Sequence, residues 1–362
     1  MLEQIRSLQP TVHKAVNPYP SLPIDSEHAS MTVNQGAIRS VYLITSYFGI
    51  EEPSNAIYGV KFKHGGGVTH EPPVIGLVDR FYEGEEYEII RMEAAHIFNR
   101  SKLYILAQSG GYIIDTKTMS RCSSFPLPRA YKSIQNVVSA YDKLYCLAIR
   151  SSFNSITDPS LERYDPDKNV WEELPSYQFY NPTFITGYTV CYGIILFSLC
   201  GGEKENCHVL AFHISRNQWK QVEVDTSVDY APFQRRAVVV GKTIYSLRMN
   251  EFIAFSFRMD KGDDGSIVYS LSQLFILQDL EIVRPPLPFD MESEYLVHLG
   301  NHDFFHVKTG RCFDKAEYLC ITTFQIVVGE GERYMIKTIN STVHSVDLEC
   351  AAYFDLVLCF MT

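Results

Sequence analysis

Short runs of apolar residues, separated by polar or glycine turns, recur along the middle of the chain. Residues 102–106 (KLYIL) have an aromatic residue at their centre, and three later segments repeat this arrangement. The later segments are residues 143–147 (KLYCL), 195–199 (ILFSL) and 243–247 (TIYSL). The aromatic centres lie 41, 52 and 48 residues apart, close to the period of about 40–50 residues that propeller blades have. The spacing predicts a repeated unit of β-strands.

Each aromatic segment is expected to be the second strand of a hairpin. Apolar strands precede two of them, at residues 136–140 and 236–240, with a polar or glycine turn between. Both strands of these hairpins are almost continuously apolar, as expected of strands buried on two faces. Glycine pairs follow two of the segments, at residues 110–111 and 201–202. At such pairs a strand must bend or another backbone must approach closely.

The repeated unit closes with a pair of strands that carries tryptophan. Residues 164–175 (YDPDKNVWEELP) indicate a strand, a tight turn and an outer strand with Trp171. Residues 212–219 are a weaker copy that ends at Trp219. Tryptophan occurs only at these two positions, and we expect each indole ring to pack against the neighbouring sheet.

Together, the strands, glycine pairs, Tyr-Asp-Pro turn and tryptophans resemble kelch repeats. The resemblance extends over about residues 94–280 and is most complete in residues 129–175, although residues 149–152 replace the double glycine there. It implies an all-β, kelch-type β-propeller, for which the strands predict six blades, with seven as the alternative. We expect one propeller over residues 36–362 and an extended lead-in over residues 1–35.

The flanks of the repeat also have strand-like patterns. Residues 40–44 and 56–60 fit a first blade, and apolar runs alternate with turns between residues 295 and 346. The apolar segment at residues 351–360 is expected to pair with the first blade and so to close the propeller. Such closure would hide both edges of a ring of sheets.

Composition and charge narrow the class of partner. The 362 residues are 46% hydrophobic and 13% aromatic, which favours a folded, β-rich chain. The formal net charge of −10 opposes binding to nucleic acid and to anionic membranes. The longest apolar region, residues 188–200, is shorter than the roughly 20 residues that a membrane-spanning helix needs. We expect neither nucleic acid nor membrane as a partner.

Cysteine usage and the N-terminal pattern bear on location. Nine cysteines are scattered along the chain without a Cys-x-x-Cys pair, so we interpret them as reduced and mostly buried. Residues 1–23 contain no apolar stretch of the secretory type. These features predict a cytoplasmic or nuclear protein.

Two motifs superficially suggest chemistry but fit the repeat better. Residues 240–243 (VGKT) resemble a phosphate-binding loop, but the full motif needs glycine where Arg236 stands. His298, His302 and His306 recur every four residues, but the glycine and asparagine between them predict a strand, a turn and a strand. We therefore expect no metal site, no cofactor and no catalytic residue.

Three arginines are the candidate binding residues. Kelch blades commonly open with an arginine, a position matched in this chain by Arg129 and by Arg235 or Arg236. The resemblance implies that these arginines lie near the loop face and the central channel, where they bind acidic peptide side chains through bidentate pairs. The alternative is an internal salt bridge or a hydrogen bond to a loop.

These features favour a non-enzymatic protein-interaction module or scaffold, not an enzyme. A propeller presents loops from every blade on one face, which suits a protein partner. Resemblance to plant F-box/kelch proteins implies substrate recognition for ubiquitin ligation, although no F-box helices are visible. The alternative is a metal-dependent enzyme with its site in the central channel, similar to galactose oxidase or to plant specifier proteins. Enzymes similar to galactose oxidase are secreted, but residues 1–23 show no secretory signal. Plant specifier proteins have a Glu-x-x-x-Asp-x-x-x-His spacing, which this sequence lacks.

Overall fold

The structure is a computed structural model of the chain. It describes residues 38–49, 54–63, 74–82, 93–107, 110–129, 135–148, 160–177, 179, 183–201, 207–225, 230–248, 251–261, 266–277, 289–312, 317–329, 334–346 and 351–362. The lead-in expected over residues 1–35 lies outside these ranges.

Antiparallel strands make up nearly all of the described chain, apart from one short 3-10 helix, η2 (Phe98–Arg100). Four sheets have four strands each. In spatial order, the first consists of β25 (Ala351–Met361), β1 (Ile38–Gly49), β2 (Ser54–Lys63) and β3 (Val74–Tyr82). The second consists of β4 (Glu93–Ile97), β5 (Lys102–Ala107), β6 (Gly110–Asp115) and β7 (Ser120–Phe125). The third is β8 (Gln135–Ala140), β9 (Lys143–Ala148), β10 (Leu161–Asp165) and β11 (Val170–Leu174), and the fourth is β21 (Phe289–Gly300), β22 (Asp303–Cys312), β23 (Glu317–Val328) and β24 (Tyr334–Val346).

A nine-stranded sheet contains two further antiparallel four-strand runs. One run is β12 (Thr183–Cys191), β13 (Ile194–Gly201), β14 (Cys207–His213) and β15 (Gln218–Asp225). The other is β17 (Val238–Val240), β18 (Thr243–Arg248), β19 (Glu251–Lys261) and β20 (Ile267–Leu277). The runs join because β15 and β20 pair in parallel, and the short strand β16 (Arg235–Arg236) adds to β12. Since this sheet can be counted as one unit or two, the predicted number of six blades stays a prediction.

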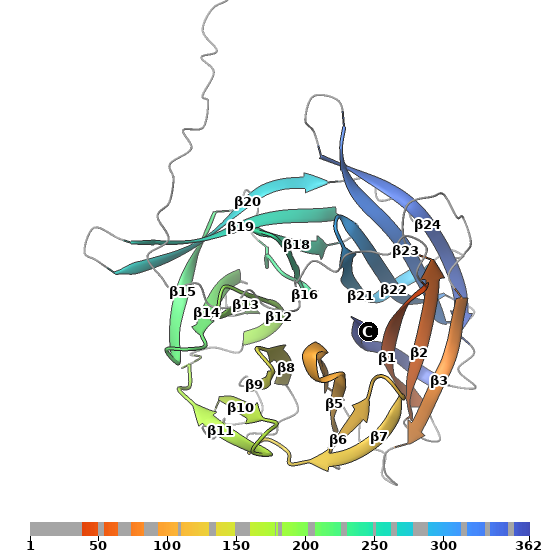
Figure 1. Ribbon diagram of the computed structural model, residues 1–362. Coiled ribbons are helices and arrows are strands. Elements are labelled where there is room, and N and C mark those ends of the chain that lie inside the picture. The colour runs from red at the N-terminus through yellow and green to blue at the C-terminus, as the bar shows by residue number, and fades with distance from the viewer. Residues whose placement is uncertain are drawn as a thin grey trace, which may run out of the picture.

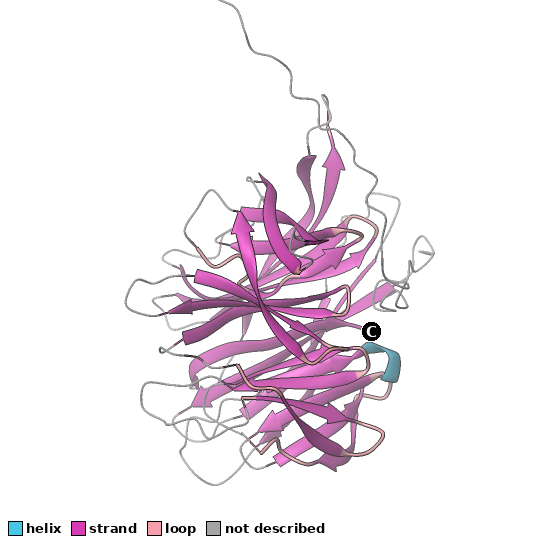
Figure 2. Cartoon of the chain, turned by 90° about the vertical axis from the view of Figure 1, so that its left-hand side faces the viewer, coloured by secondary structure: helices cyan, strands magenta, loops and turns pink. Residues whose placement is uncertain are grey.

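The sheets stand around a central axis, as Figure 1 shows. Strands β8, β12, β16 and β21 lie towards the centre of the ring, and β3, β7, β11, β15, β20 and β24 lie at its rim. The side view in Figure 2 shows strands of neighbouring sheets stacked across the molecule. The predicted β-propeller architecture is confirmed by this arrangement.

The closing strand lies where the sequence pattern indicates. Strand β25 pairs with β1 in antiparallel fashion, with Val41 opposite Met361. The first and last described strands of the chain therefore share one sheet, so the ring has no open seam between them.

The repeated aromatic residues lie in the cores between neighbouring sheets. Tyr104, Tyr145, Phe197 and Tyr245 belong to β5, β9, β13 and β18, and all four are buried. Strands in this position contact a sheet on either side, which explains their almost continuous apolar sequence.

Lysine and aspartate hold the repeated hairpin to its outer turn. The Lys102 Nζ atom lies 2.7 Å from Asp115 Oδ2, and Lys143 Nζ lies 2.6 Å from Asp165 Oδ2. The hydrogen bond from lysine is the main reason why the pKa of each aspartate is lowered to about 2. The lysine that opens two of the repeated segments thus has a structural role.

Both tryptophans tie their sheet to the preceding one. Trp171 Nε1 on β11 donates a hydrogen bond of 2.7 Å to the carbonyl oxygen of Pro126, which follows β7. Trp219 Nε1 on β15 makes the same 2.7 Å bond to Pro175, which follows β11. The expected packing of these rings against a neighbouring sheet is confirmed.

Replacing Trp171 by phenylalanine should lower the free energy of unfolding by about 1–3 kcal/mol, through the lost hydrogen bond and the smaller ring. Denaturant titration measures this change. The exposed Glu173 lies on the same strand, so Glu173→Gln is the matched control and should be close to neutral. Equal midpoints for the two variants would show that the indole does not hold the two sheets together.

Candidate binding site at the centre of the ring

A central pocket lies where the innermost strands of the sheets meet. Its walls come from β4, β8, β12, β16, β21 and β25. The lining residues are Glu93, Ala94, Asn136, Val137, Tyr188, Arg235, Arg236, Tyr295, Asp355, Val357 and Leu358. The empty space amounts to about 500 Å³, including the part open to solvent.

The pocket lies towards the end of the ring at which several innermost strands begin. Glu93 and Arg235 are the first residues of β4 and β16, and Asn136 is the second residue of β8. In an antiparallel four-strand run, the fourth strand ends at the side where the first one starts. The connections from one sheet to the next therefore lie at the pocket's end of the ring.

A close backbone contact positions the two consecutive arginines. Arg235 and Arg236 pair in parallel with Gly187 and Tyr188 of β12. The N–H of Ala237 donates to the carbonyl oxygen of Tyr188 at 2.8 Å. A Cβ atom on Gly187 would lie 2.3 Å from the Arg235 carbonyl oxygen, so only glycine permits this approach.

Arg235 itself has a left-handed backbone, with a φ of 57°. This conformation is unusual for a residue with a side chain, and it persists where surrounding contacts enforce it, often at functional sites. In this chain the pairing with β12 supplies those contacts.

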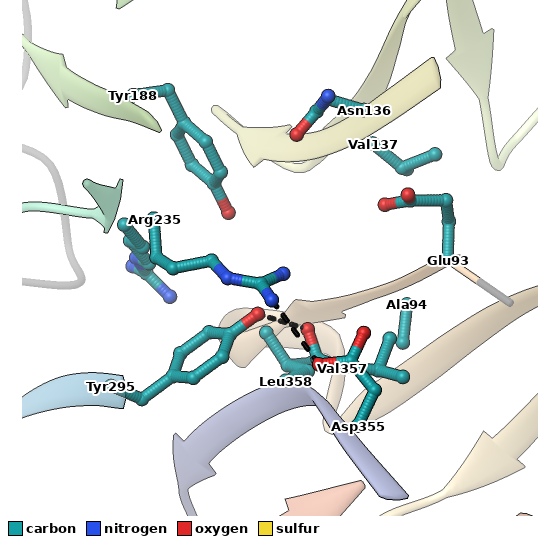
Figure 3. A pocket seen from close by; sticks show the side chains of 11 residues that line it. Glu93, Ala94, Asn136, Val137, Tyr188, Arg235, Tyr295, Asp355, Val357 and Leu358 are labelled. Carbon is teal, nitrogen blue, oxygen red and sulfur yellow. Dashed lines mark hydrogen bonds and ion pairs between the residues drawn. The ribbon is translucent and has the colours of Figure 1, made fainter. Parts of the chain in front are cut away.

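The Arg235 guanidinium lies between an acid and an aromatic ring. Its Nη2 atom is 3.2 Å from Asp355 Oδ1, and its Cζ atom is 5.5 Å from the centre of the Tyr295 ring. The Tyr295 hydroxyl donates to the carbonyl oxygen of Val357, and burial raises the pKa of this tyrosine. Figure 3 shows Arg235, Tyr188, Glu93 and Asn136 directed towards a common space.

Arg236 influences a buried histidine at the edge of this region. His96, on β4, stacks on Phe360 with ring centres 4.3 Å apart. Burial, and secondarily the charge of Arg236, lower the pKa of His96 to about 3. His96 is therefore neutral at physiological pH.

The structure brings together two of the three predicted binding residues. Arg235 and Arg236 line the central pocket, whereas Arg129 is exposed after β7 and is not among the lining residues. The backbone N–H of Arg129 donates to Glu162 Oε1 at 3.1 Å. The alternative expected for these arginines was an internal salt bridge. Arg235 does make one, with Asp355, and both residues line the pocket.

Five polar or aromatic lining residues are absent from the sequence-based set. They are Glu93, Asn136, Tyr188, Tyr295 and Asp355. Each comes from the innermost strand of a different run, so no short sequence window contains two of them. The one feature of the sequence that these residues share is that each belongs to an innermost strand.

The glycine-lysine-threonine motif and the three histidines lie in strands and turns of the sheets. Gly241 is in the turn between β17 and β18, in agreement with the predicted hairpin. His298 and His306 lie on β21 and β22, and His302 is in the turn between them. His306 Nε2 is buried 3.4 Å from Glu294 Oε2. Within the described ranges, no group of three or more His, Cys, Asp or Glu side chains is arranged to hold a metal ion.

As for membrane association, none of the helical segments in the part of the chain that the structure describes has the length and apolarity to span a bilayer.

Comparison with known proteins shows similarity at the level of solved structures. The structure of YjhT aligns with a TM-score of 0.39 and 12% identity, over 71% of this chain and 98% of that one. YCF48 bound to D1 peptide aligns with a TM-score of 0.40 and 9% identity, over 85% and 86% of the two chains. U3-55K aligns with a TM-score of 0.34 and 12% identity, over 87% and 84%. No family model matches the sequence, and no curated protein matches it, so the kelch resemblance is not confirmed.

Proposed function

We propose that this chain is a non-catalytic protein-interaction module that binds an acidic segment of a partner protein at the central pocket. The observation that carries the proposal is the placement of Arg235 and Arg236 together at this pocket, on a segment seated directly against Gly187. Arginine–carboxylate pairs are strong and geometrically specific, so this segment suits recognition of Asp or Glu side chains.

The guanidinium of Arg235 is the group that we assign to the ligand carboxylate. A guanidinium has five N–H donors, and the ion pair with Asp355 is made through Nη2. The Tyr295 ring supports one part of this cation.

The other lining groups restrict the ligand. Tyr188 and Asn136 offer neutral donors and acceptors for a peptide backbone. Glu93 carries a negative charge at the pocket, which disfavours a second acidic group near it. One or two carboxylates beside the arginines therefore fit the site better than a long acidic run.

The experiment is selection of a random peptide library on the purified full chain. We expect enrichment of peptides that contain Asp or Glu, with affinities that fall as salt increases because exposed charges are screened. Selection of peptides without acidic residues, or of none at all, would remove the basis of the proposal.

Arg235→Gln should weaken binding of the selected peptides by about 10–100-fold, since a charged hydrogen bond contributes about 1.5–3 kcal/mol. Fluorescence anisotropy with a labelled peptide measures the affinity. Arg258→Gln is the control, because Arg258 is exposed on β19 and does not line the pocket. A similar affinity for both variants would place the peptide elsewhere on the molecule.

Part of the same proposal is that the module selects substrates for ubiquitin ligation in the cytoplasm or nucleus, as kelch resemblance implies. Depletion of the chain from cells should then raise the abundance of its partner, as proteasome inhibition should. If depletion did not change the turnover of the partner, the ubiquitin role would be excluded and only the scaffold role would remain.

A further inference from the structure

Two of the nine cysteines face each other across a pair of hydrogen-bonded strands. Cys200 lies near the end of β13 and Cys207 begins β14, and the register places them directly opposite. Their Sγ atoms are 2.8 Å apart, and neither residue forms a disulfide. Opposite residues of an antiparallel pair have Cα atoms about 4.5–5.5 Å apart, inside the range of about 4.4–6.8 Å found in disulfides.

The environment of the pair sets the order in which the two thiols can react. Burial, together with the contact to Cys200, raises the pKa of Cys207 to about 12. A thiol reacts as its thiolate, so Cys207 is a poor first nucleophile at neutral pH. The Cys207 thiol also donates its hydrogen to Cys200 Sγ, so Cys200 is the sulfur expected to react first with an external oxidant.

We propose that Cys200 and Cys207 are a reversible redox pair, which glutathione disulfide converts into an intramolecular disulfide. The Cys200 thiolate attacks one sulfur of glutathione disulfide and releases one glutathione, which takes up a proton. Cys207 then gives its proton to solvent and attacks the Cys200 sulfur, which releases the second glutathione. The two cysteines lose two electrons in total, and glutathione disulfide gains them.

The pair lies beside the segment that carries the pocket arginines. A hydrogen bond involving the Ala231 backbone reaches Cys207, and Ala231 precedes Arg235 by four residues. The end of β13 and the start of β14 also lie at the end of the ring where β12 begins, since Thr183 pairs with Gly201. A disulfide at this position joins the ends of β13 and β14, with β12 between these strands and β16.

The test is incubation of the full chain with glutathione disulfide, followed by alkylation of remaining thiols and mass spectrometry. We expect a linked peptide pair that contains Cys200 and Cys207, two hydrogen atoms lighter than the two reduced peptides together, with no glutathione retained on either cysteine. Dithiothreitol should reverse the change. The oxidised form should also melt at a higher temperature, because the cross-link constrains the unfolded chain.

Three variants separate this pair from other thiols. Cys122→Ser removes an exposed thiol and should leave the linked pair unchanged. Cys207→Ser should stop the reaction at the first step, with one glutathione retained on Cys200. Cys200→Ser should leave Cys207 unmodified.

Two results would overturn the proposal: a wild-type protein in which both thiols stay alkylatable, or one that keeps glutathione on Cys200 without forming the linked pair. Mapping of the wild-type protein gives this answer even if a serine variant does not fold.

Discussion

Replacing Gly187 by alanine should both destabilise the fold and weaken binding at the central pocket. The new Cβ would lie 2.3 Å from the carbonyl oxygen and 2.8 Å from the nitrogen of Arg235. Both are backbone atoms, so no side-chain rotation relieves the contact. The segment with Arg235 and Arg236 must therefore move away from β12. We expect a loss of about 2–4 kcal/mol in the free energy of unfolding.

Denaturant titration and peptide affinity measure the two effects of this substitution. We expect the affinity for selected acidic peptides to fall by about tenfold or more, because both guanidinium groups lose their positions. Gly76→Ala on β3 is the matched control, since its Cβ would meet no atom within 4 Å. That control should change stability by less than about 1 kcal/mol. If the two variants behaved alike, the close backbone approach at Gly187 would not be what positions the arginines.

Lowering the pH from 7 to 4.5 should destabilise the protein by roughly 2–3 kcal/mol through His96 alone. The pKa of His96 is lowered to about 3 in the folded state, from an ordinary value of 6.5. Between pH 6.5 and about 3, His96 therefore binds a proton in the unfolded chain but not in the folded chain. The contribution of neutral His96 to the free energy of unfolding is fully present above pH 6.5 and is lost as the pH falls from there towards 3.

The variant His96→Leu isolates this contribution. Leucine cannot bind a proton, so the free energy of unfolding of the variant should depend less on pH between 6.5 and 4.5, by roughly 2–3 kcal/mol. His302→Gln changes an exposed histidine in the turn after β21 and should leave the pH dependence as in the wild type. Parallel pH profiles for wild type and His96→Leu would mean that His96 is not buried in its neutral form.

The repeating strands could be predicted because their signal is local. Residues around Tyr104, Tyr145, Phe197 and Tyr245 carry the apolar pattern of doubly buried strands within a few positions. The tryptophans could be assigned to outer strands for the same reason, and their bonds to Pro126 and Pro175 agree with that assignment. The strand over residues 351–360 was also recognisable, since a long apolar run needs a partner sheet.

The central pocket and the cysteine pair could not be predicted in the same way. The residues that line the pocket are as far apart in the sequence as Glu93 and Leu358. The distances between them in space depend on how the ring closes. The cysteine pair depends on the register between β13 and β14, which places Cys200 opposite Cys207. A shift of one residue in that register would turn one sulfur to the other face of the sheet.

Local patterns of apolar, glycine and turn residues were thus sufficient for the repeated hairpins, the outer strands with tryptophan and the closing strand, because each pattern acts over a few residues. The composition of the pocket came from the closed ring, which brings Arg235 and Asp355 within 3.2 Å although they are 120 residues apart. Contacts at such separation follow from the packing of whole sheets, and no short segment encodes them.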